Sequence, residues 1–255
     1  MSNPVAVITG ASRGIGKQLC VDLAAAGYDI VCAARSSADS PSKLPGTVDE
    51  TAELVRAHGR IAMPVALDVR DEDAIAALAD RVYSELGRCD LVVNNAAIAP
   101  PGPTLQAPTK RWRLAVDINI NGPLYMMYYF CPRMSTGEGR VINISSSASQ
   151  APEFGRISYT TTKRALEAMS EGMAYELAGK VAVNCIRLEL SVWSEGYTAT
   201  LPGNDFSEFE DPVIMSDAAL WLAKQPIDYT GHVLTIADMR AMGVVRAVTR
   251  MGDRA

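Results

Sequence analysis

The sequence predicts an α/β fold, a doubly wound parallel sheet of about seven strands with helices on both faces. Three observations lead to this prediction. Short apolar runs without polar alternation recur along the chain, as expected of parallel strands that are buried on both faces. Segments whose apolar residues have helical spacing separate these runs. The 255 residues contain no solenoid repeat and no low-complexity tract, so we expect one domain over residues 1–255.

The expected strands are apolar runs that end at glycine, proline or polar residues. The first is a β-branched run that stops at Gly10, and the second is followed by a polar loop at residues 36–45. In chain order, the strands are expected at residues 5–9, 30–34, 62–67, 90–94, 139–145, 181–186 and 232–236.

The expected helices lie between these strands. The first begins near Gly14, directly after the first strand. The other helices are expected at residues 48–58, 72–86, 110–134 with Pro123 near its middle, 159–177 and 216–224.

The least regular stretches of the sequence are residues 36–47 and 191–211. Both follow strands, at the edge where open α/β sheets bind ligands.

The composition argues against several classes of protein. Lys plus Arg number 24 and Asp plus Glu number 29, a formal charge of −5, so no basic surface for nucleic acid is expected. The five cysteines are isolated, which indicates free, mostly buried thiols in a reducing compartment and no zinc site. The chain starts Met1-Ser2-Asn3-Pro4 without a basic leader, and its longest apolar stretch, residues 123–132, is about half a membrane span. We therefore expect a cytoplasmic protein that binds neither nucleic acid nor a membrane.

The first strand runs into a glycine-rich turn, Thr9-Gly10-Ala11-Ser12-Arg13-Gly14-Ile15-Gly16. Glycine lets the backbone approach a pyrophosphate closely, and the N-terminus of the next helix offers N–H donors and a partial positive charge. A plain strand-to-helix turn is the alternative, but three glycines at the first turn of a β-α-β unit favour a dinucleotide site. A P-loop is excluded because it requires Gly at Ala11 and Ser or Thr at Gln18.

The end of the second strand predicts which cofactor binds. An NAD site usually has Asp or Glu there, which accepts hydrogen bonds from the ribose 2′-hydroxyl. Here the strand runs into Arg35 and Ser36, and Arg13 lies in the glycine turn. Two guanidiniums without a carboxylate fit a 2′-phosphate, so NADP(H) is preferred over NAD(H). The alternative is that Arg35 is only a solvated loop residue, and Lys43 is a weaker candidate for the phosphate.

A tyrosine and a lysine are the candidate proton-transfer residues. The two histidines, His58 and His232, lie far from the strand-end loops, so neither Ser-His-Asp chemistry nor a metal centre is expected. Tyr159 and Lys163 have i, i+4 spacing and share one helix face. An ammonium beside a phenol favours the phenolate, which prepares the tyrosine to exchange a proton with a carbonyl or alcohol. The alternative is an amphipathic helix with both side chains in solvent.

These motifs together resemble the short-chain dehydrogenase/reductase family, which combines Thr-Gly-x-x-x-Gly-Ile-Gly with Tyr-x-x-x-Lys on a Rossmann-type sheet. The order glycine turn, Asn, Ser, Tyr/Lys is that of the family, and the resemblance covers about residues 4–240. Ser146 lies 13 residues before Tyr159, the separation that the family has. Its neighbours Ser145 and Ser147 are expected to be turn or capping residues.

The resemblance implies a role for each candidate residue. Tyr159 is the general acid in reduction and the base in oxidation, Ser146 polarises the substrate oxygen, and Lys163 supports the tyrosine and binds the nicotinamide ribose. Asn119, in preference to Asn121, maintains a proton relay through water. The substrate is a small molecule with a carbonyl or a secondary alcohol. The residues expected at the cofactor are Gly10, Ser12, Arg13, Gly14, Ile15, Gly16, Arg35, Ser36, Asp68, Val69, Asn95, Ala96, Tyr159 and Lys163.

The sequence departs from the family after the sixth strand. Leu188 and Glu189 replace the usual Pro-Gly, which removes an expected contact with the nicotinamide carboxamide. Glu189 and Trp193 either shape the substrate pocket or repack the loop. The long loop at residues 40–47, together with residues 108–111, resembles hydroxysteroid-dehydrogenase-like members of the family.

Two other functions remain open at this point. A non-catalytic NADP(H)-binding sensor of the same fold would tolerate loss of the Tyr159 hydroxyl. An epimerase or dehydratase acting on a nucleotide sugar is disfavoured because the region after the sixth strand is short. The resemblance also implies a homo-oligomer, a tetramer or a dimer, paired through the long helices at residues 110–134 and 159–177.

Overall fold

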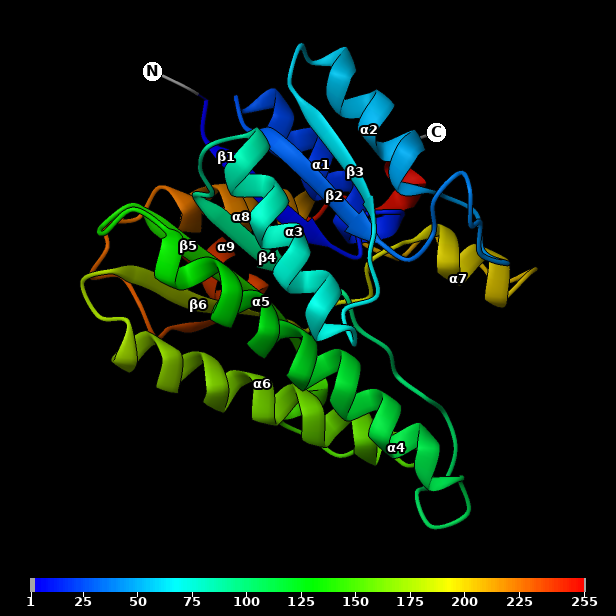
Figure 1. The fold of residues 1–255 in the computed structure, drawn as a ribbon. Coiled ribbons are helices and arrows are strands. Elements are labelled where there is room, and N and C mark those ends of the chain that lie inside the picture. Colours follow the sequence, from blue (N-terminus) through cyan, green and yellow to red (C-terminus); the bar gives the residue numbers. More distant parts are fainter. Residues whose placement is uncertain (1–2, 255) are drawn as a thin grey trace.

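A seven-stranded parallel sheet forms the centre of the molecule (Figure 1). The computed structural model describes residues 3–254. The side chains at positions 197, 200, 253 and 254 lie outside that description. Met1 and Ser2, which belong to the expected leaderless start, lie outside it as well. The strands are β1 (Val5–Thr9), β2 (Asp29–Ala34), β3 (Ala62–Ala66), β4 (Leu91–Asn94), β5 (Gly139–Ser146), β6 (Val181–Leu188) and β7 (Val233–Thr235). Their order in the sheet is β3-β2-β1-β4-β5-β6-β7. The predicted Rossmann-type α/β fold is confirmed.

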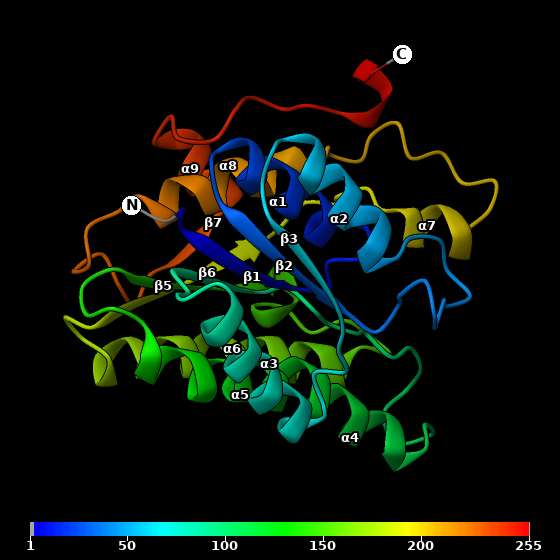
Figure 2. The same cartoon turned by 45° about the horizontal axis from the view of Figure 1, so that its top comes forward.

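Helices cover both faces of the sheet, as predicted (Figure 2). One layer contains α1 (Gly14–Ala25), α2 (Val48–Ala57), α8 (Val213–Ala223) and α9 (Ile236–Ala241). The opposite layer contains α3 (Glu72–Glu85), α4 (Thr109–Val116), α5 (Gly122–Phe130) and α6 (Ile157–Glu176). A short helix, α7 (Glu195–Thr200), lies apart from both layers (Figure 1).

The sheet separates two apolar cores, because neighbouring residues on a strand face opposite sides. On β1, Ile8 packs into the core that contains α1 and α8, whereas Val7 packs into the core that contains α3 and α5. All of β1 is buried, which explains why the sequence shows no polar alternation there. Full burial of one such aliphatic side chain stabilises the fold by roughly 1.5–3 kcal/mol. The central strands therefore hold the loops at their carboxyl ends firmly in place.

The long helix expected at residues 110–134 is wrong as a single α-helix. The chain forms α4, a π-helical turn at Asp117–Asn121, α5, and a 3-10 turn at Cys131–Arg133. Pro123 has no N–H to donate to a carbonyl of the preceding turn, and the wider π-helical turn lies directly before it. Asn119 lies within this turn, and π-helical turns are frequent at functional sites.

The carboxyl-terminal part of the chain differs most from the expectation. The strand expected at residues 232–236 is shorter because Thr235 caps α9 through reciprocal hydrogen bonds with Asp238. Neither α7 nor α9 was predicted from the sequence, although the Thr-x-x-Asp spacing is a signal for α9. Helix α6 begins at Ile157, two residues before the expected start, and β6 continues to Leu188.

All five cysteines are free and buried. Burial raises the pKa of the Cys131 and Cys185 thiols to about 12, so both are protonated at neutral pH. Between residues 3 and 254, no helix combines the length and the apolarity that crossing a membrane requires.

Candidate active site

The glycine turn connects β1 with α1 at the carboxyl edge of the sheet. A Cβ atom at Gly16 would lie 2.2 Å from the carbonyl oxygen of Gly10, so only glycine fits at this close approach. The backbone N–H groups of Asn95 and Ala96 donate to Thr9 Oγ1, at 3.0 and 3.1 Å. These bonds join the end of β4 to the turn, and they place two predicted cofactor segments side by side.

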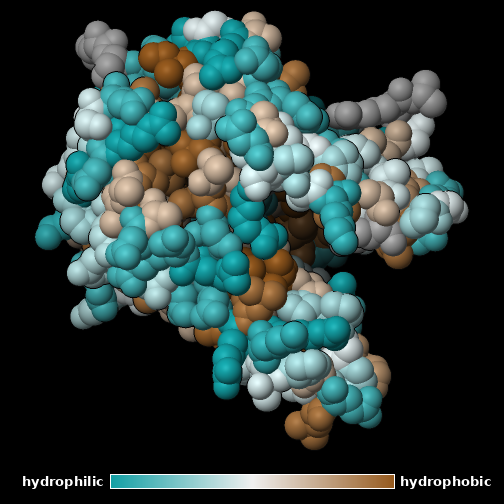
Figure 3. Space-filling view, turned by 45° about the vertical axis from the view of Figure 1, so that its right-hand side comes forward, coloured by the Kyte–Doolittle hydropathy of each residue, from teal (hydrophilic) through white to brown (hydrophobic). Residues whose placement is uncertain are grey.

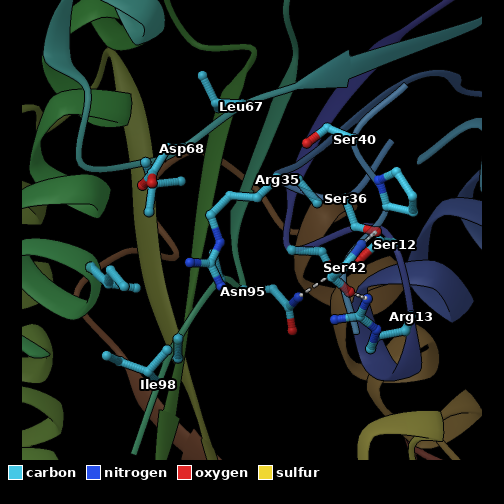
Figure 4. Close-up of a pocket in the computed structure, with 17 residues that line it drawn as sticks. Ser12, Arg13, Arg35, Ser36, Ser40, Ser42, Leu67, Asp68, Asn95 and Ile98 are labelled. Atoms are coloured by element: carbon cyan, nitrogen blue, oxygen red, sulfur yellow. Dashed lines mark hydrogen bonds between the residues drawn. The ribbon is translucent and has the colours of Figure 1, made fainter. Parts of the chain in front are cut away.

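A cavity of about 510 Å³ opens on one side of the glycine turn, and we call it the arginine cavity. It collects predicted cofactor residues from the ends of four strands (Figure 4). Arg35 extends across it toward Asn95, while Arg13 lies on the side of the glycine turn (Figure 4). The predicted residues that line the arginine cavity are Gly10, Ser12, Arg13, Arg35, Ser36, Asp68, Val69, Asn95 and Ala96.

The two arginines of this cavity have different surroundings. Arg13 donates to the carbonyl oxygens of residues 44–46 and to Ser42 Oγ, at distances of 2.7–3.2 Å. Burial lowers the pKa of Arg13; Glu195 opposes this shift and Arg35 adds to it, so the two guanidiniums are close enough to repel. Arg13 therefore holds the loop after β2 in shape, whereas Arg35 is the cation that faces the cavity.

Asp68 lies on the opposite side of the arginine cavity from Arg13 (Figure 4). Arg70 Nε donates to both of its carboxylate oxygens at 3.0 Å. This side-chain hydrogen bond lowers the pKa of the Asp68 carboxyl, which keeps the group ionised and paired. The predicted residue Ser36 is also engaged, since its hydroxyl donates to the Gly46 carbonyl at 2.9 Å.

A second cavity of about 440 Å³ lies on the other side of the glycine turn, and we call it the tyrosine cavity. Lys163 is 3% exposed, and its Nζ donates to the Ile144 carbonyl at 2.6 Å and lies 5.6 Å from the centroid of the Tyr159 ring. The alternative in which the Lys163 side chain lies in solvent on an amphipathic helix is therefore wrong. Figure 3 shows a recess with an apolar floor between α7 and the projecting end of α4. The predicted residues that line the tyrosine cavity are Arg13, Gly14, Ile15, Gly16, Asn95, Ser146, Tyr159 and Lys163.

The three serines at the end of β5 have different partners. Ser145 is a buried residue of β5, so its expected turn or capping role is wrong, and its hydroxyl donates to Glu167 Oε1 at 2.7 Å. Ser147 begins a 3-10 turn, as its expected turn role requires, and the hydroxyl of Ser146 accepts from the N–H of Ala148 at 3.3 Å. The 3-10 turn thus holds the hydroxyl of Ser146, which lines the tyrosine cavity.

Asn119 lies behind the site and lines neither cavity. Its Oδ1 accepts from the N–H of Ile98 and its Nδ2 donates to the Ile98 carbonyl, both at 2.9 Å. The same Nδ2 donates to Thr162 Oγ1, at 3.0 Å. Asn119 therefore holds the π-helical turn against the helix that contains Tyr159 and Lys163, and its relay role stays a prediction.

Comparison with known proteins agrees with this geometry. The family model described as short chain dehydrogenase matches residues 4–190 of the chain. The chain belongs to the short-chain dehydrogenase family. Members of this family are NAD(P)-dependent oxidoreductases, and the resemblance in the glycine turn and the Tyr-x-x-x-Lys motif is thereby confirmed.

Curated relatives of this short-chain dehydrogenase include hydroxysteroid dehydrogenase-like protein 2. The protein from Bos taurus is 32% identical over 230 residues, which cover 89% of this chain and 55% of the relative. The protein from Homo sapiens is 33% identical over 233 residues, which cover 88% of this chain and 54% of the relative. The chain thus spans about half the length of the curated relatives it matches. The narrower resemblance expected from the long loop is confirmed as a likeness in sequence.

Solved structures of other dehydrogenases share the fold. A putative dehydrogenase from Xanthomonas campestris has a TM-score of 0.84 and 27% identity, covering 95% of this chain and 91% of that one. A short chain dehydrogenase from Mycobacterium paratuberculosis, crystallised with NAD, has a TM-score of 0.78 and 26% identity, covering 92% of this chain and 96% of that one.

Beneath the Ser-Tyr-Lys set of this short-chain dehydrogenase lies an ion pair that was not predicted from the sequence. Glu167 follows Lys163 by one turn of α6 and pairs with Arg187 of β6 at 2.8 Å. Its carboxylate also accepts from Ser145 and Ser149, both at 2.7 Å. Burial raises the pKa of Glu167, but the hydrogen bonds from Arg187 and the two serines outweigh this effect and lower it. The continued i, i+4 spacing after Lys163 is the signal that could have identified Glu167.

The two residues left open after the sixth strand also have defined contacts. The carboxylate of Glu189 accepts from the N–H groups of Ile236 and Ala237, at 3.1 and 2.6 Å, at the start of α9. Trp193 Nε1 donates to Thr198 Oγ1 at 3.1 Å. Both Glu189 and Trp193 line the tyrosine cavity. Shaping the pocket and packing the loop are therefore compatible roles. Glu189 and Trp193 each make hydrogen bonds that hold the segment after β6, and each also borders the tyrosine cavity.

Proposed function

We propose that this short-chain dehydrogenase is an NADP(H)-dependent oxidoreductase that transfers a hydride between the nicotinamide and a carbonyl or secondary alcohol of a small organic substrate. The observation that carries the proposal is the convergence of Ser146, Tyr159 and Lys163 on one cavity at the glycine turn. The arginine cavity opens on the other side of that turn, and Arg13 and Asn95 line both cavities. The two cavities are therefore placed to receive the two ends of one extended dinucleotide.

The residues of the tyrosine cavity divide the chemistry. When bound, the nicotinamide supplies or accepts the hydride. The hydroxyl of Tyr159 gives its proton to the carbonyl oxygen in reduction and takes a proton back in oxidation. The hydroxyl of Ser146 donates to the same oxygen and holds it beside the tyrosine. Lys163 places a buried ammonium 5.6 Å from the centroid of the Tyr159 ring, on the side of the tyrosine cavity. Because Arg187 neutralises Glu167, the carboxylate one turn further along α6 does not cancel that charge.

The preference for NADP(H) rests on the arginine cavity. Arg35 faces this cavity, and β2 ends in Ala34 without a carboxylate. A charge-assisted hydrogen bond between a guanidinium and a 2′-phosphate stabilises a complex by about 1.5–3 kcal/mol. Asp68 borders the same cavity, but its pairing with Arg70 limits its repulsion of a phosphate. A similar dehydrogenase was crystallised with NAD, so NADH is the ligand against which this preference is measured.

The proposal includes a cytoplasmic homo-oligomer, a dimer or a tetramer. Five buried free thiols support a reducing compartment. Exposed aromatic side chains on the outer helices, Trp112 of α4 and Tyr128 of α5, support pairing through this layer.

The test of the catalytic assignment is Tyr159→Phe. Loss of the hydroxyl removes the proton donor but leaves the cofactor cavities intact, so we expect turnover to fall about 10³-fold while the variant still binds NADPH. Turnover is followed at the nicotinamide absorbance over a panel of ketones and aldehydes, and affinity by NADPH fluorescence. Tyr175→Phe, at the exposed far end of α6, is the matched control and should change neither quantity.

Two outcomes would contradict the proposal in different ways. Turnover that survives in the Tyr159→Phe variant would remove the tyrosine from the mechanism. A wild-type protein that binds NADPH tightly but reduces nothing in the panel would favour a dinucleotide sensor of the same fold.

A further inference from the structure

The segment after β6 folds back onto the glycine turn, although the two are far apart in the sequence. A parallel bridge between Val192 and Glu210 anchors its start. Residues 194–200, which we call the strap, then cross the N-terminus of α1 and include all of α7. A Cβ atom at Gly14, where φ is +52°, would lie 2.7 Å from Cβ of Ser194. The strap is thus in direct contact with the turn expected to hold the dinucleotide.

A carboxylate of the strap binds the N-terminus of α1. Oε2 of Glu195 accepts from the backbone N–H of Gly14 at 2.7 Å, and Oε1 lies 3.1 Å from Nζ of Lys17. The Glu195 side chain is 20% exposed. Burial raises the pKa of Glu195, but backbone hydrogen bonds, including that from Gly14, and the Lys17 ammonium outweigh burial and lower it. Glu195 is therefore an anion at neutral pH and satisfies a donor at the start of a 12-residue helix.

The same position is where a dinucleotide would place its pyrophosphate. Cofactor anions bind at helix N-termini because backbone N–H groups and the helix dipole both favour negative charge. Gly14 lines the tyrosine cavity, Ser12 lines the arginine cavity, and Arg13 between them lines both. A ligand that spans the two cavities must therefore pass the N–H that Glu195 occupies. Two anions cannot share this donor, and their mutual repulsion adds to the conflict.

We propose that Glu195 is a tethered anion that takes the place of the dinucleotide pyrophosphate, and that the strap must open before the cofactor spans the glycine turn. This inference rests on the proposed dinucleotide binding. Glu195 then sets cofactor affinity, because a ligand that needs a minor open state binds more weakly in proportion to the population of that state. A ligand confined to the arginine cavity, such as adenosine 2′-monophosphate, does not meet the strap.

The first experiment compares Glu195→Gln with the wild-type protein. The amide keeps the size of the side chain but loses the charge and the ion pair with Lys17. We expect NADPH to bind the variant about tenfold more tightly, with the affinity for adenosine 2′-monophosphate unchanged. Glu176→Gln, an exposed position at the end of α6, makes the same charge change and should leave both affinities at the wild-type value. Affinities come from fluorescence and calorimetric titrations.

A second measurement needs no cofactor. Hydrogen exchange of peptides that cover residues 194–200 should be faster in the unliganded Glu195→Gln variant than in the wild-type protein, and NADPH should accelerate the same peptides in the wild type. Equal exchange in both unliganded proteins, or equal NADPH affinity, would overturn the strap as a competitor. Equal tightening of NADPH and adenosine 2′-monophosphate would overturn it as well, because it would be a general charge effect. A third outcome is that exchange accelerates in the variant but neither protein binds NADPH or NADH. The contact of Glu195 with the N-terminus of α1 would then be confirmed, but the proposed dinucleotide binding, and with it the competition, would be wrong.

Discussion

The tyrosine cavity and the arginine cavity flank the same glycine turn, but different interactions hold them in shape. The tyrosine cavity is built on β5 and α6, above the pair formed by Glu167 and Arg187. The arginine cavity is bounded by the loop at residues 36–47, which Arg13 holds through backbone carbonyls. Breaking a buried ion pair costs about 3–5 kcal/mol, whereas a single hydrogen bond contributes about 0.5–1.5 kcal/mol. The chemistry is therefore held rigidly, and cofactor choice depends on a loop that is easier to change.

The largest effect is expected from Glu167→Gln, which removes the charge beneath the tyrosine cavity. Arg187 loses its counter-charge, and Ser145 and Ser149 lose a charged acceptor. Because the Arg187 side chain is 22% exposed, we expect the free energy of unfolding at pH 7 to fall by about 2–3 kcal/mol, somewhat less than for a fully buried pair. Urea unfolding measures this loss. Glu171→Gln, at an exposed position one turn further along α6, should change stability by less than about 0.5 kcal/mol.

The pH dependence of this loss has a defined sign. The folded protein lowers the pKa of Glu167, so the carboxylate stabilises the fold fully above its unfolded-state value of about 4.5. That contribution disappears as the pH falls through the lower folded-state value. The difference between the wild type and Glu167→Gln should therefore shrink below about pH 4. A difference that stays constant with pH would mean that packing, and not charge, holds this region.

An intermediate effect is expected from Arg35→Ala, which tests the arginine cavity. Loss of the cation that faces this cavity should weaken NADPH binding about tenfold, while NADH changes by less than about twofold. Arg60→Ala is the matched control, because Arg60 precedes β3 and so lies at the opposite edge of the sheet. Fluorescence titration with both cofactors gives the ratio. Equal weakening of NADPH and NADH would show that Arg35 does not recognise the 2′-phosphate.

The sequence predicted the rigid side of this comparison well. The apolar runs indicated the strands, and the helical spacing of Tyr159 and Lys163 indicated that both side chains reach one cavity, because these patterns act over a few residues. The π-helical turn around Asn119 could not be predicted, since it depends on how the turn packs against α6. Proline at position 123 was visible, but the sequence does not specify whether the helix kinks, breaks or widens there.

The arginine cavity and the strap were predicted less completely from the sequence. The sequence placed Arg13 and Arg35 at the same ligand, yet only the folded loop reveals that Arg13 already donates to residues 44–46. The contact of Glu195 with Gly14 joins positions 181 residues apart. No local pattern encodes a pairing over that distance, because it depends on where the chain returns after β6.

The smallest effect is expected from Arg13→Ala, which separates the two arginines. Because its donors are taken by the loop, its loss should weaken NADPH binding by only about two- to threefold, against about tenfold for Arg35→Ala. The loss should instead accelerate hydrogen exchange in peptides that cover residues 40–47, where Ser42 and the carbonyls of residues 44–46 lose their donor. Arg13→Lys keeps the charge without the planar fork, so exchange should accelerate there too while affinity stays near the wild-type value. If Arg13→Ala weakens NADPH as much as Arg35→Ala, the guanidinium leaves the loop to bind the phosphate, and the loop then adjusts to the cofactor more than the hydrogen bonds of Arg13 indicate.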